Sequence, residues 1–248
     1  MITVLFHPRE LPENAGNARV VVLDVLRATS TIVTALNAGA KEVRLFDSLE
    51  GARGAKAAAP VPAVLAGEKA CLKPEDFDLG NSPREHVTEK VGGATVLLAT
   101  TNGTRAAVAG QKAGAMSLYV ASLLNATATA RALVPGIDSR DTILLCAGTN
   151  GEHSLEDVLG AGSILFSLLQ TTYRTDLALT DSAWTAYHAF AATRQRLPAA
   201  LRLGQGGINV INAGLEDDID ACARLDAIPL VARIIGEGGS LVVRRETE

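Results

Sequence analysis

Short runs of β-branched and aliphatic residues alternate with alanine-rich stretches of helical periodicity through the first 150 residues. Single helices between apolar strands are typical of a mainly parallel sheet that is covered on both faces. The apolar runs predict strands over 20–25, 42–46, 63–66, 95–99, 117–120 and 142–146. Helices are predicted between them, over 31–38, 49–59, 105–112 and 126–133. We therefore expect an α/β fold whose chemistry lies at the carboxyl ends of the strands.

The pattern changes after Cys146. Longer helical stretches are predicted over 155–170, 181–196 and 216–224, and strands return only near 229–232 and 240–243. A chain of 248 residues is long enough for one large domain or for two closely packed ones. We predict two closely packed α/β subdomains, residues 1–150 and a more helical one, residues 151–248.

Charge and hydropathy exclude several classes of protein. With 23 basic and 27 acidic residues and no basic run longer than Arg244-Arg245, the chain is not expected to bind nucleic acid. No apolar stretch reaches the roughly 18 to 20 residues of a membrane span, and the N-terminus lacks a signal-peptide pattern, so we expect a cytoplasmic protein that does not enter a membrane. The three cysteines form no close pair and the four histidines lack a zinc-ligand spacing, which argues against disulfides and zinc.

Four segments share one design, in which an apolar strand runs into a polar turn and then into a helix. The first, residues 22–31, brings Asp24, Arg27, Thr29 and Ser30 to one place. Hydroxyls and free N–H groups at a helix start suit a phosphate, and a guanidinium can bind one bidentately. Asp24 could hold a metal or act as a nucleophile. The alternative is a capping carboxylate with a surface arginine, but an unpaired carboxylate is costly to bury in so apolar a run.

The second segment follows the predicted strand at 95–99. It contains Thr101, Asn102, Gly103, Thr104 and Arg105. Because a helix is predicted directly after the Asn-Gly turn, this turn is expected to supply backbone N–H groups and hydroxyls at a helix start. Arg105 adds a positive charge. The alternative is a capped connecting loop without a ligand.

The third and fourth segments add carboxylates. Residues 146–157 place two acids in the first turn of a helix, where they complement the helix dipole and also suit a hard cation such as Mg²⁺. Residues 67–83 form a long polar loop with an acid at its mouth, and loops this long in compact domains are usually functional. The candidates from the two segments are Gly148, Glu156, Asp157, Glu68, Asn81 and Ser82.

Known phosphatase and nucleotide-binding signatures are absent from the sequence. None of the cysteines is followed by arginine six positions later, which excludes the cysteine-phosphatase motif. Asp24-Val25-Leu26 has leucine where the aspartyl-phosphate phosphatases need a second aspartate. The chain also has no P-loop motif for a nucleotide.

Taken together, six blocks resemble the 2-phosphosulfolactate phosphatase family over nearly the whole chain. They are LDVLRATSTIVTALNAGAKEV (23–43), GE (67–68), FDLGNSP (77–83), TTNGTRA (100–106), CAGTNGEHSLED (146–157) and GLEDDIDACARLD (214–226). The resemblance implies a Mg²⁺-dependent hydrolase that converts (2R)-2-phospho-3-sulfolactate to 3-sulfolactate for coenzyme M synthesis. It also implies a three-layer α/β/α fold with two subdomains. The chain departs from the family pattern at 203–207, where Leu-Gly-Gln-Gly-Gly replaces a Ser/His/Gly-type stretch.

Chemistry then assigns roles to the candidate residues. Mg²⁺ is expected on Asp24 with some of Glu68, Glu156 and Asp157, and the catalytic groups are expected to be Asp24, Arg27 and Arg105. The expected substrate contacts are Thr29, Ser30, Asn81, Ser82, Thr101, Asn102, Gly103, Thr104 and Gly148. Attack by metal-bound water and a covalent phospho-enzyme on Asp24 both remain open.

Two other functions would use the same loops. A phosphosugar isomerase or lyase would bind its phosphate in the same way but rearrange or cleave carbon bonds. A non-enzymatic phosphoanion-sensing module would need the loops but not the carboxylates, which repel an anion unless a cation is bound. The expected partner is in each case a small anionic phosphate compound, and the sequence leaves monomer and homodimer open.

Overall fold

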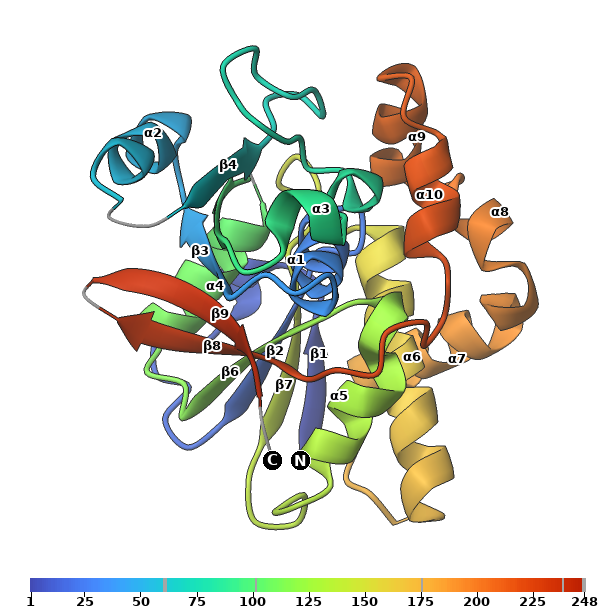
Figure 1. Ribbon diagram of the computed structural model, residues 1–248. Coiled ribbons are helices and arrows are strands. Elements are labelled where there is room, and N and C mark those ends of the chain that lie inside the picture. Colours follow the sequence, from blue (N-terminus) through green and yellow to red (C-terminus); the bar gives the residue numbers. More distant parts are fainter. Residues whose placement is uncertain (60–61, 101, 175, 238, 247–248) are drawn as a thin grey trace.

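The computed structural model describes residues 1–59, 62–100, 102–174, 176–237 and 239–246. Within these residues nine strands form one sheet in the order β1-β7-β2-β6-β8-β9-β3-β5-β4 (Figure 1). The strands are β1 (Ile2–Leu5), β2 (Arg19–Leu23), β3 (Glu42–Phe46), β4 (Ala63–Gly67), β5 (Thr95–Ala99), β6 (Ser117–Ala121), β7 (Thr142–Cys146), β8 (Ala232–Glu237) and β9 (Ser240–Arg245).

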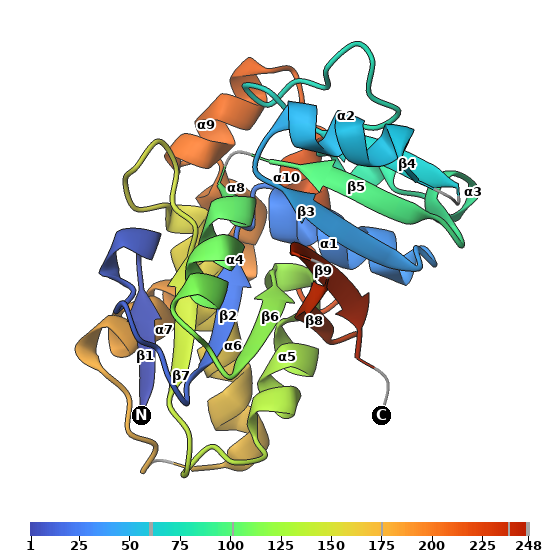
Figure 2. The ribbon, with the colours of Figure 1, turned by 90° about the vertical axis from the view of Figure 1, so that its left-hand side faces the viewer.

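The sheet has two parallel parts joined by an antiparallel hairpin. Strands β1, β7, β2 and β6 pair in parallel, and so do β3, β5 and β4. The β8–β9 hairpin lies between them and pairs antiparallel with β6 on one side and with β3 on the other. In Figure 2 the first part stands upright, whereas β3 and β5 lie across the upper right. This turn of the sheet brings the carboxyl ends of both parts toward one region, although the two parts run in opposite directions along the sheet.

Both faces of the first part are covered, as the apolar strand sequences predict. In β2, Val20 and Val22 pack in a core cluster with Ile32 of the first helix, whereas Val21 and Leu23 pack in another cluster on the opposite face. Residues 20–23 of β2 are all fully buried. Successive residues of a strand point to opposite faces, so a strand that is apolar throughout needs a layer of helices on each side.

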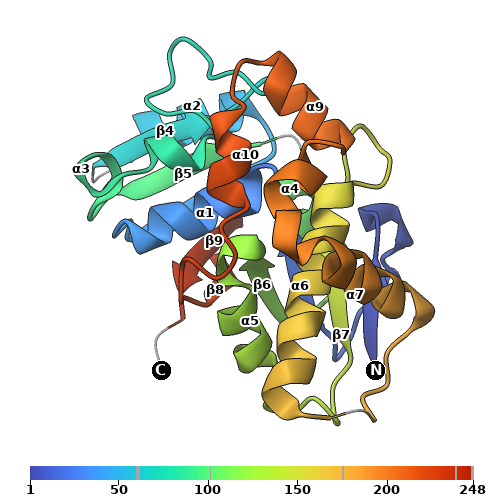
Figure 3. The same ribbon diagram turned by 90° about the vertical axis from the view of Figure 1, so that its right-hand side faces the viewer.

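Helices supply those layers. They are α1 (Ala28–Asn37), α2 (Leu49–Ala57), α3 (Thr88–Val91), α4 (Gly103–Lys112), α5 (Ala126–Leu133), α6 (Leu155–Thr172), α7 (Asp181–Thr193), α8 (Leu197–Leu201), α9 (Gln205–Asn212) and α10 (Asp217–Cys222). Helix α6 packs on α5, α7 and β7, and α4 packs on β2. Figure 3 shows α5 and α6 in front of β6 and β7. The predicted α/β class is confirmed, and no helix among the described residues is both long enough and apolar enough to cross a membrane.

Several element bounds differ from the sequence prediction. Strand β2 ends at Leu23 rather than at residue 25, because the chain turns at Asp24 into α1. The strand expected over 229–232 is wrong, since β8 starts only at Ala232 and Pro229 has no N–H to donate to a sheet. Strand β1 was not predicted. It is four residues long and is held by parallel pairing with β7.

Helix α9 was also not predicted. Its first turn contains two glycines, which weaken helix propensity. Strands β8 and β9, which follow the proposed boundary near residue 150, belong to the same sheet as the strands before it. The division into two subdomains stays a prediction.

Candidate active site

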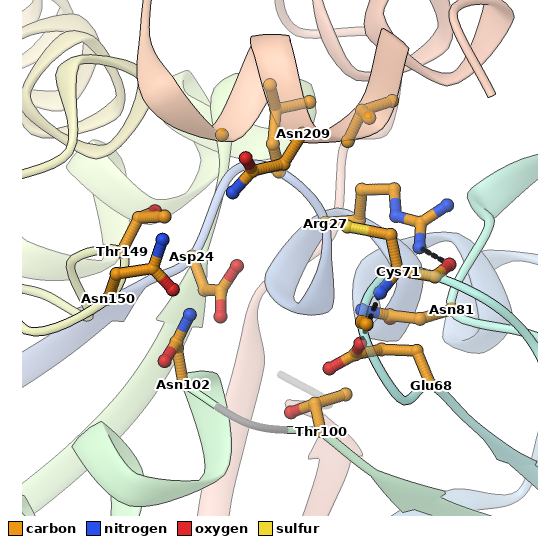
Figure 4. A pocket seen from close by; sticks show the side chains of 14 residues that line it. Asp24, Arg27, Glu68, Cys71, Asn81, Thr100, Asn102, Thr149, Asn150 and Asn209 are labelled. Atoms are coloured by element: carbon orange, nitrogen blue, oxygen red, sulfur yellow. Dashed lines mark hydrogen bonds between the residues drawn. The ribbon is translucent and has the colours of Figure 1, made fainter. Parts of the chain in front are cut away.

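The carboxyl ends of four strands, two from each part of the sheet, meet at one pocket. Leu23 at the end of β2 pairs with Cys146 at the end of β7, and Gly67 at the end of β4 pairs with Ala99 at the end of β5. The turns that follow these strands line a pocket of about 220 Å³, which α9 closes from the other side (Figure 4). Its lining residues are Asp24, Leu26, Arg27, Glu68, Ala70, Cys71, Asn81, Thr100, Asn102, Thr149, Asn150, Gly206, Asn209 and Val210.

Asp24 is the most deeply buried carboxylate on the wall of this pocket, with 7% of its surface exposed. Its carbonyl oxygen accepts from both the N–H and the hydroxyl of Thr29 at 2.9 Å, and its Oδ1 accepts from the N–H of Ala28 at 3.3 Å. These bonds close the turn that starts α1. Burial raises the pKa of Asp24 to about 7, and repulsion from Glu156 and Glu68 adds to the increase.

Gly103 brings the start of α4 against this carboxylate. Its backbone N–H donates to Asp24 and opposes the rise in the pKa of that group. A Cβ at position 103 would lie 2.9 Å from Oδ2 of Asp24 and 2.9 Å from Cβ of Ala28. Only glycine therefore allows this close approach.

Arg27 lies on the pocket wall and is held from two sides. Its Nη1 donates to Oδ2 of Asp218 at 2.7 Å, and its Nη2 donates to the carbonyl of Cys71 at 2.5 Å. The side chains of Arg27 and Asp218 are 2% and 1% exposed. The guanidinium is therefore fixed in orientation, and its charge is largely balanced before any ligand binds.

The long loop from 68 to 82 forms a further wall. Oε2 of Glu68 accepts from the N–H of Cys71 at 2.8 Å, and the hydroxyl of Ser82 donates to Oδ1 of Asp218 at 2.6 Å. Asn81 is buried beside the pocket, and its side-chain oxygen has no hydrogen-bond partner among the described residues. A buried acceptor without a donor is a place where a ligand or a cation can bind.

Five of the predicted site residues line the pocket, and the others lie around it. The five are Asp24, Arg27, Glu68, Asn81 and Asn102. Thr29 and Ser30 direct their hydroxyls to the backbone carbonyls of Asp24 and Val25, and Thr104 contacts the hydroxyl of Thr100 at 3.2 Å. The hydroxyls of Thr29, Ser30 and Thr104 shape the turns, and these three residues do not line the pocket. Thr101 lies outside the described residues.

Asp157 and Gly148 form a brace between two turns. Oδ1 of Asp157 accepts from the N–H of Val25 at 2.8 Å, and Oδ2 accepts from the N–H of Gly148 at 3.1 Å. Burial, together with repulsion from Asp24 and Glu156, raises the pKa of Asp157 well above its usual range. Both oxygens of Asp157 are thus occupied in joining the turns after β2 and β7.

Glu156 is 1% exposed, and neither of its carboxylate oxygens has a hydrogen-bond partner among the described residues. Burial raises the pKa of this carboxyl, and the nearby Ser154 and Thr149 hydroxyls oppose the increase. Those two hydroxyls contact each other at 3.0 Å, without hydrogen-bonding geometry toward Glu156. The carboxylate lies behind the pocket, against the glycines that begin α9.

Arg105 lies in an adjoining pocket. This second pocket, of about 320 Å³, shares Glu68 and Thr100 with the first. The Arg105 side chain is exposed there, near Lys69 and the start of α2. Arg27 and Arg105, which the sequence analysis assigns to one site, therefore line two adjoining pockets.

Several lining residues were not predicted. They are Cys71, Thr100, Thr149, Asn150 and Asn209, with Asp218 as the buried partner of Arg27. Thr149 and Asn150 belong to the CAGTNGEHSLED block, and Asp218 belongs to the GLEDDIDACARLD block. Their position in segments that resemble the family could have marked them as site residues. Asn209 carried no signal, because its helix was not predicted.

The oxygen donors of the pocket fit a hard cation. Within the described ranges no three His, Cys, Asp or Glu side chains gather to hold a metal ion. Mg²⁺, however, is usually held by one or two carboxylates, with water and substrate phosphate as the remaining ligands. Asp24 supplies such a donor at the end of β2, and Glu68 and the unpartnered oxygen of Asn81 supply others from the wall formed by the 68–82 loop.

Comparison with known proteins places this arrangement in a family. A family model described as 2-phosphosulpholactate phosphatase matches residues 5–236. The chain belongs to the 2-phosphosulfolactate phosphatase family. It is 37% identical over 243 residues to a probable 2-phosphosulfolactate phosphatase of Carboxydothermus hydrogenoformans, covering 98% of this chain and 96% of that one. It is 38% identical to the proteins of the same name from Thermotoga maritima (87% of this chain, 88% of the relative) and Caldanaerobacter subterraneus (87% of each). The name of this family denotes phosphoric monoester hydrolases.

Proposed function

We propose that the chain is a Mg²⁺-dependent phosphatase that hydrolyses (2R)-2-phospho-3-sulfolactate to 3-sulfolactate and inorganic phosphate. The observation that carries the proposal is the pocket in which Asp24, Arg27 and the start of α4 converge at the ends of four strands. Membership of the 2-phosphosulfolactate phosphatase family supports the choice of substrate. A place in coenzyme M biosynthesis and a cytoplasmic location stay predictions.

The charge of the pocket supports a cation in the reaction. Among the described lining residues the charged side chains are Asp24, Glu68 and Arg27, and Arg27 is already paired with Asp218. A substrate that carries phosphate, carboxylate and sulfonate would be repelled by this set. Asp24 and Glu68, with the Asn81 oxygen, would hold Mg²⁺. When bound, Mg²⁺ neutralises charge on the phosphoryl oxygens and polarises the ester.

The residues of the chain then have distinct tasks. Arg27, fixed by Asp218 and Cys71, donates its remaining N–H groups to the phosphoryl oxygens. Gly103 holds the Asp24 carboxylate through its N–H. On one route Asp24 attacks phosphorus, the bond from phosphorus to the C2 oxygen breaks, 3-sulfolactate leaves with a proton from water, and a second water hydrolyses the aspartyl-phosphate. On the other route Asp24 orients the water that attacks phosphorus, and 3-sulfolactate is released in the same step. Acid-quenched protein would retain radiolabelled phosphate from the substrate only on the first route.

One assay tests the proposal. Inorganic phosphate release is measured from 2-phosphosulfolactate and from 2-phospholactate, each with Mg²⁺ and with EDTA. We expect release that depends on Mg²⁺ and is faster with 2-phosphosulfolactate. Absence of phosphate release with Mg²⁺ would refute the function, and equal release in EDTA would refute the role of the cation.

A further inference from the structure

We propose that Asn209 on α9 binds the sulfonate of the substrate, which makes α9 the specificity wall of the pocket. This inference rests on the proposed function. Helix α9 contributes Gly206, Asn209 and Val210 to the pocket lining, opposite the strand ends. Figure 4 shows the Asn209 amide extending from the helix into the pocket, toward Asp24.

A hydrogen bond within α9 fixes the orientation of this amide. The Nε2 of Gln205 donates to Oδ1 of Asn209 at 2.9 Å. Since the Asn209 oxygen is engaged by Gln205, its NH₂ group is the part directed into the pocket, as Figure 4 shows. The wall therefore presents a neutral donor, which suits an oxyanion.

Buried contacts of its first turn and of Val210 set the position of the helix. A Cβ at Gly206 would lie 1.8 Å from Oε1 of Glu156, and a Cβ at Gly204 would lie 2.7 Å from Oε2. The backbone at the start of α9 thus rests directly on a carboxylate that is itself almost wholly buried. Val210 packs in a core cluster with Val25 and Leu159. The distance from Asn209 to the strand ends is therefore fixed by packing.

The chemistry of the substrate indicates which group reaches this wall. Phosphate and carboxylate are both attached to C2, whereas the sulfonate is attached to C3 and extends away from them. Phosphate and carboxylate are the better ligands for a hard cation and for a guanidinium. Arg27 and the carboxylates that would hold the cation lie at the strand ends, across the pocket from α9. A sulfonate is a very weak base, so a neutral amide can bind it without a cation.

The test compares two substrates that differ only in the sulfonate, 2-phosphosulfolactate and 2-phospholactate. The loss of one hydrogen bond to a charged group predicts that Asn209→Ala lowers kcat/KM for 2-phosphosulfolactate by about 10-fold to 100-fold. For 2-phospholactate we expect a decrease of less than about threefold, because that substrate has no sulfonate to lose. Asn209→Asp, which places a negative charge opposite the sulfonate, should cause a larger loss for 2-phosphosulfolactate than for 2-phospholactate.

Asn212→Ala is the matched control, because Asn212 is an exposed asparagine on the same helix that does not line the pocket. The Asn212→Ala variant should leave kcat/KM unchanged for both substrates. Equal losses for the two substrates in Asn209→Ala, or no loss, would overturn the proposal. Both substitutions place alanine in a helix, where its propensity is favourable, so we expect folded variants.

A binding measurement separates this inference from the proposed function. Calorimetry with the Mg²⁺-loaded protein gives Kd for 3-sulfolactate and for lactate. Asn209→Ala should weaken 3-sulfolactate binding by about 10-fold or more and leave lactate unchanged. If the wild-type protein releases no phosphate from either compound, the proposed function fails. An unchanged Kd for 3-sulfolactate in the variant overturns the role of Asn209 whether or not phosphate is released.

Discussion

Replacing Asp24 by asparagine should make the protein more stable and nearly inactive. The folded chain raises the pKa of this carboxyl from 3.8 to about 7, chiefly through burial. At about 1.4 kcal/mol per pH unit, the shift corresponds to about 4 kcal/mol of folding free energy lost when Asp24 is ionised. The asparagine side chain carries no charge, so this cost disappears in the variant.

The sign of the effect sets its pH window. Below about pH 3.8 the Asp24 carboxyl is protonated in both the folded and the unfolded chain, and it does not destabilise the fold. Between about 3.8 and 7 the unfolded chain ionises first, so wild-type stability falls as pH rises. At pH 8 the Asp24→Asn variant should therefore be about 2 to 4 kcal/mol more stable. The lower figure allows for the single acceptor oxygen that asparagine offers to the N–H groups of Ala28 and Gly103.

Urea unfolding in EDTA at pH 4 and pH 8 measures this difference, and phosphate release with Mg²⁺ measures activity. Activity should fall by about 100-fold or more, the scale of losing a central electrostatic group. The exposed Asp181→Asn serves as a control, with a stability change below about 1 kcal/mol. A variant no more stable than wild type at pH 8 would refute the burial argument. Near-normal turnover in a folded variant would show that Asp24 is structural.

Four further outcomes follow from the site. Removing metal with EDTA should abolish phosphate release, and Mg²⁺ or Mn²⁺ should restore it, because the pocket offers oxygen donors suited to a hard cation; full activity in metal-free protein would contradict this. Gly103→Val should lower kcat/KM by about 100-fold, since its Cβ would displace the Asp24 carboxylate, while circular dichroism shows an intact fold; unchanged kinetics would mean that the approach of α4 is unimportant. Arg27→Lys should lower kcat/KM by about 10-fold or more and unfolding free energy by about 2 kcal/mol, because lysine cannot bridge Asp218 and the Cys71 carbonyl. Arg105→Lys should change kcat/KM by less than about threefold, because it keeps the charge in the exposed adjoining pocket; a larger loss for Arg105 than for Arg27 would reverse these roles.

Local patterns in the sequence were enough for the α/β class and for the position of Asp24. The apolar run 20–23 must be buried on both faces, and a carboxylate at its end must lie where parallel strands end. The same reasoning placed Glu68, Asn81 and Asn102 at the pocket. These features depend on residues close together in the chain, so a single sequence contains the signal.

Local patterns leave two interpretations open where a polar group can have two uses. Thr29 and Ser30 resemble phosphate ligands, yet their hydroxyls bond to carbonyls of their own turn. Asp157 resembles a metal ligand, yet both of its oxygens accept from backbone N–H groups. A hydroxyl or carboxylate at a helix start can serve the backbone or a ligand, and only the surrounding atoms decide between them.

The sequence by itself determined strands β2 to β7, helices α1, α2, α4 and α5, and which turns carry polar groups, because hydrophobic periodicity and turn chemistry act over a few residues. Only the tertiary structure decided which of those turns meet. Arg27 pairs with Asp218, 191 residues later, and α9 closes the pocket because its glycines fit against Glu156. The antiparallel β8–β9 hairpin reverses the sheet, and the turn of the sheet brings the ends of β2, β4, β5 and β7 together. Such contacts join distant segments through the direction and twist of a sheet, and no local pattern specifies either.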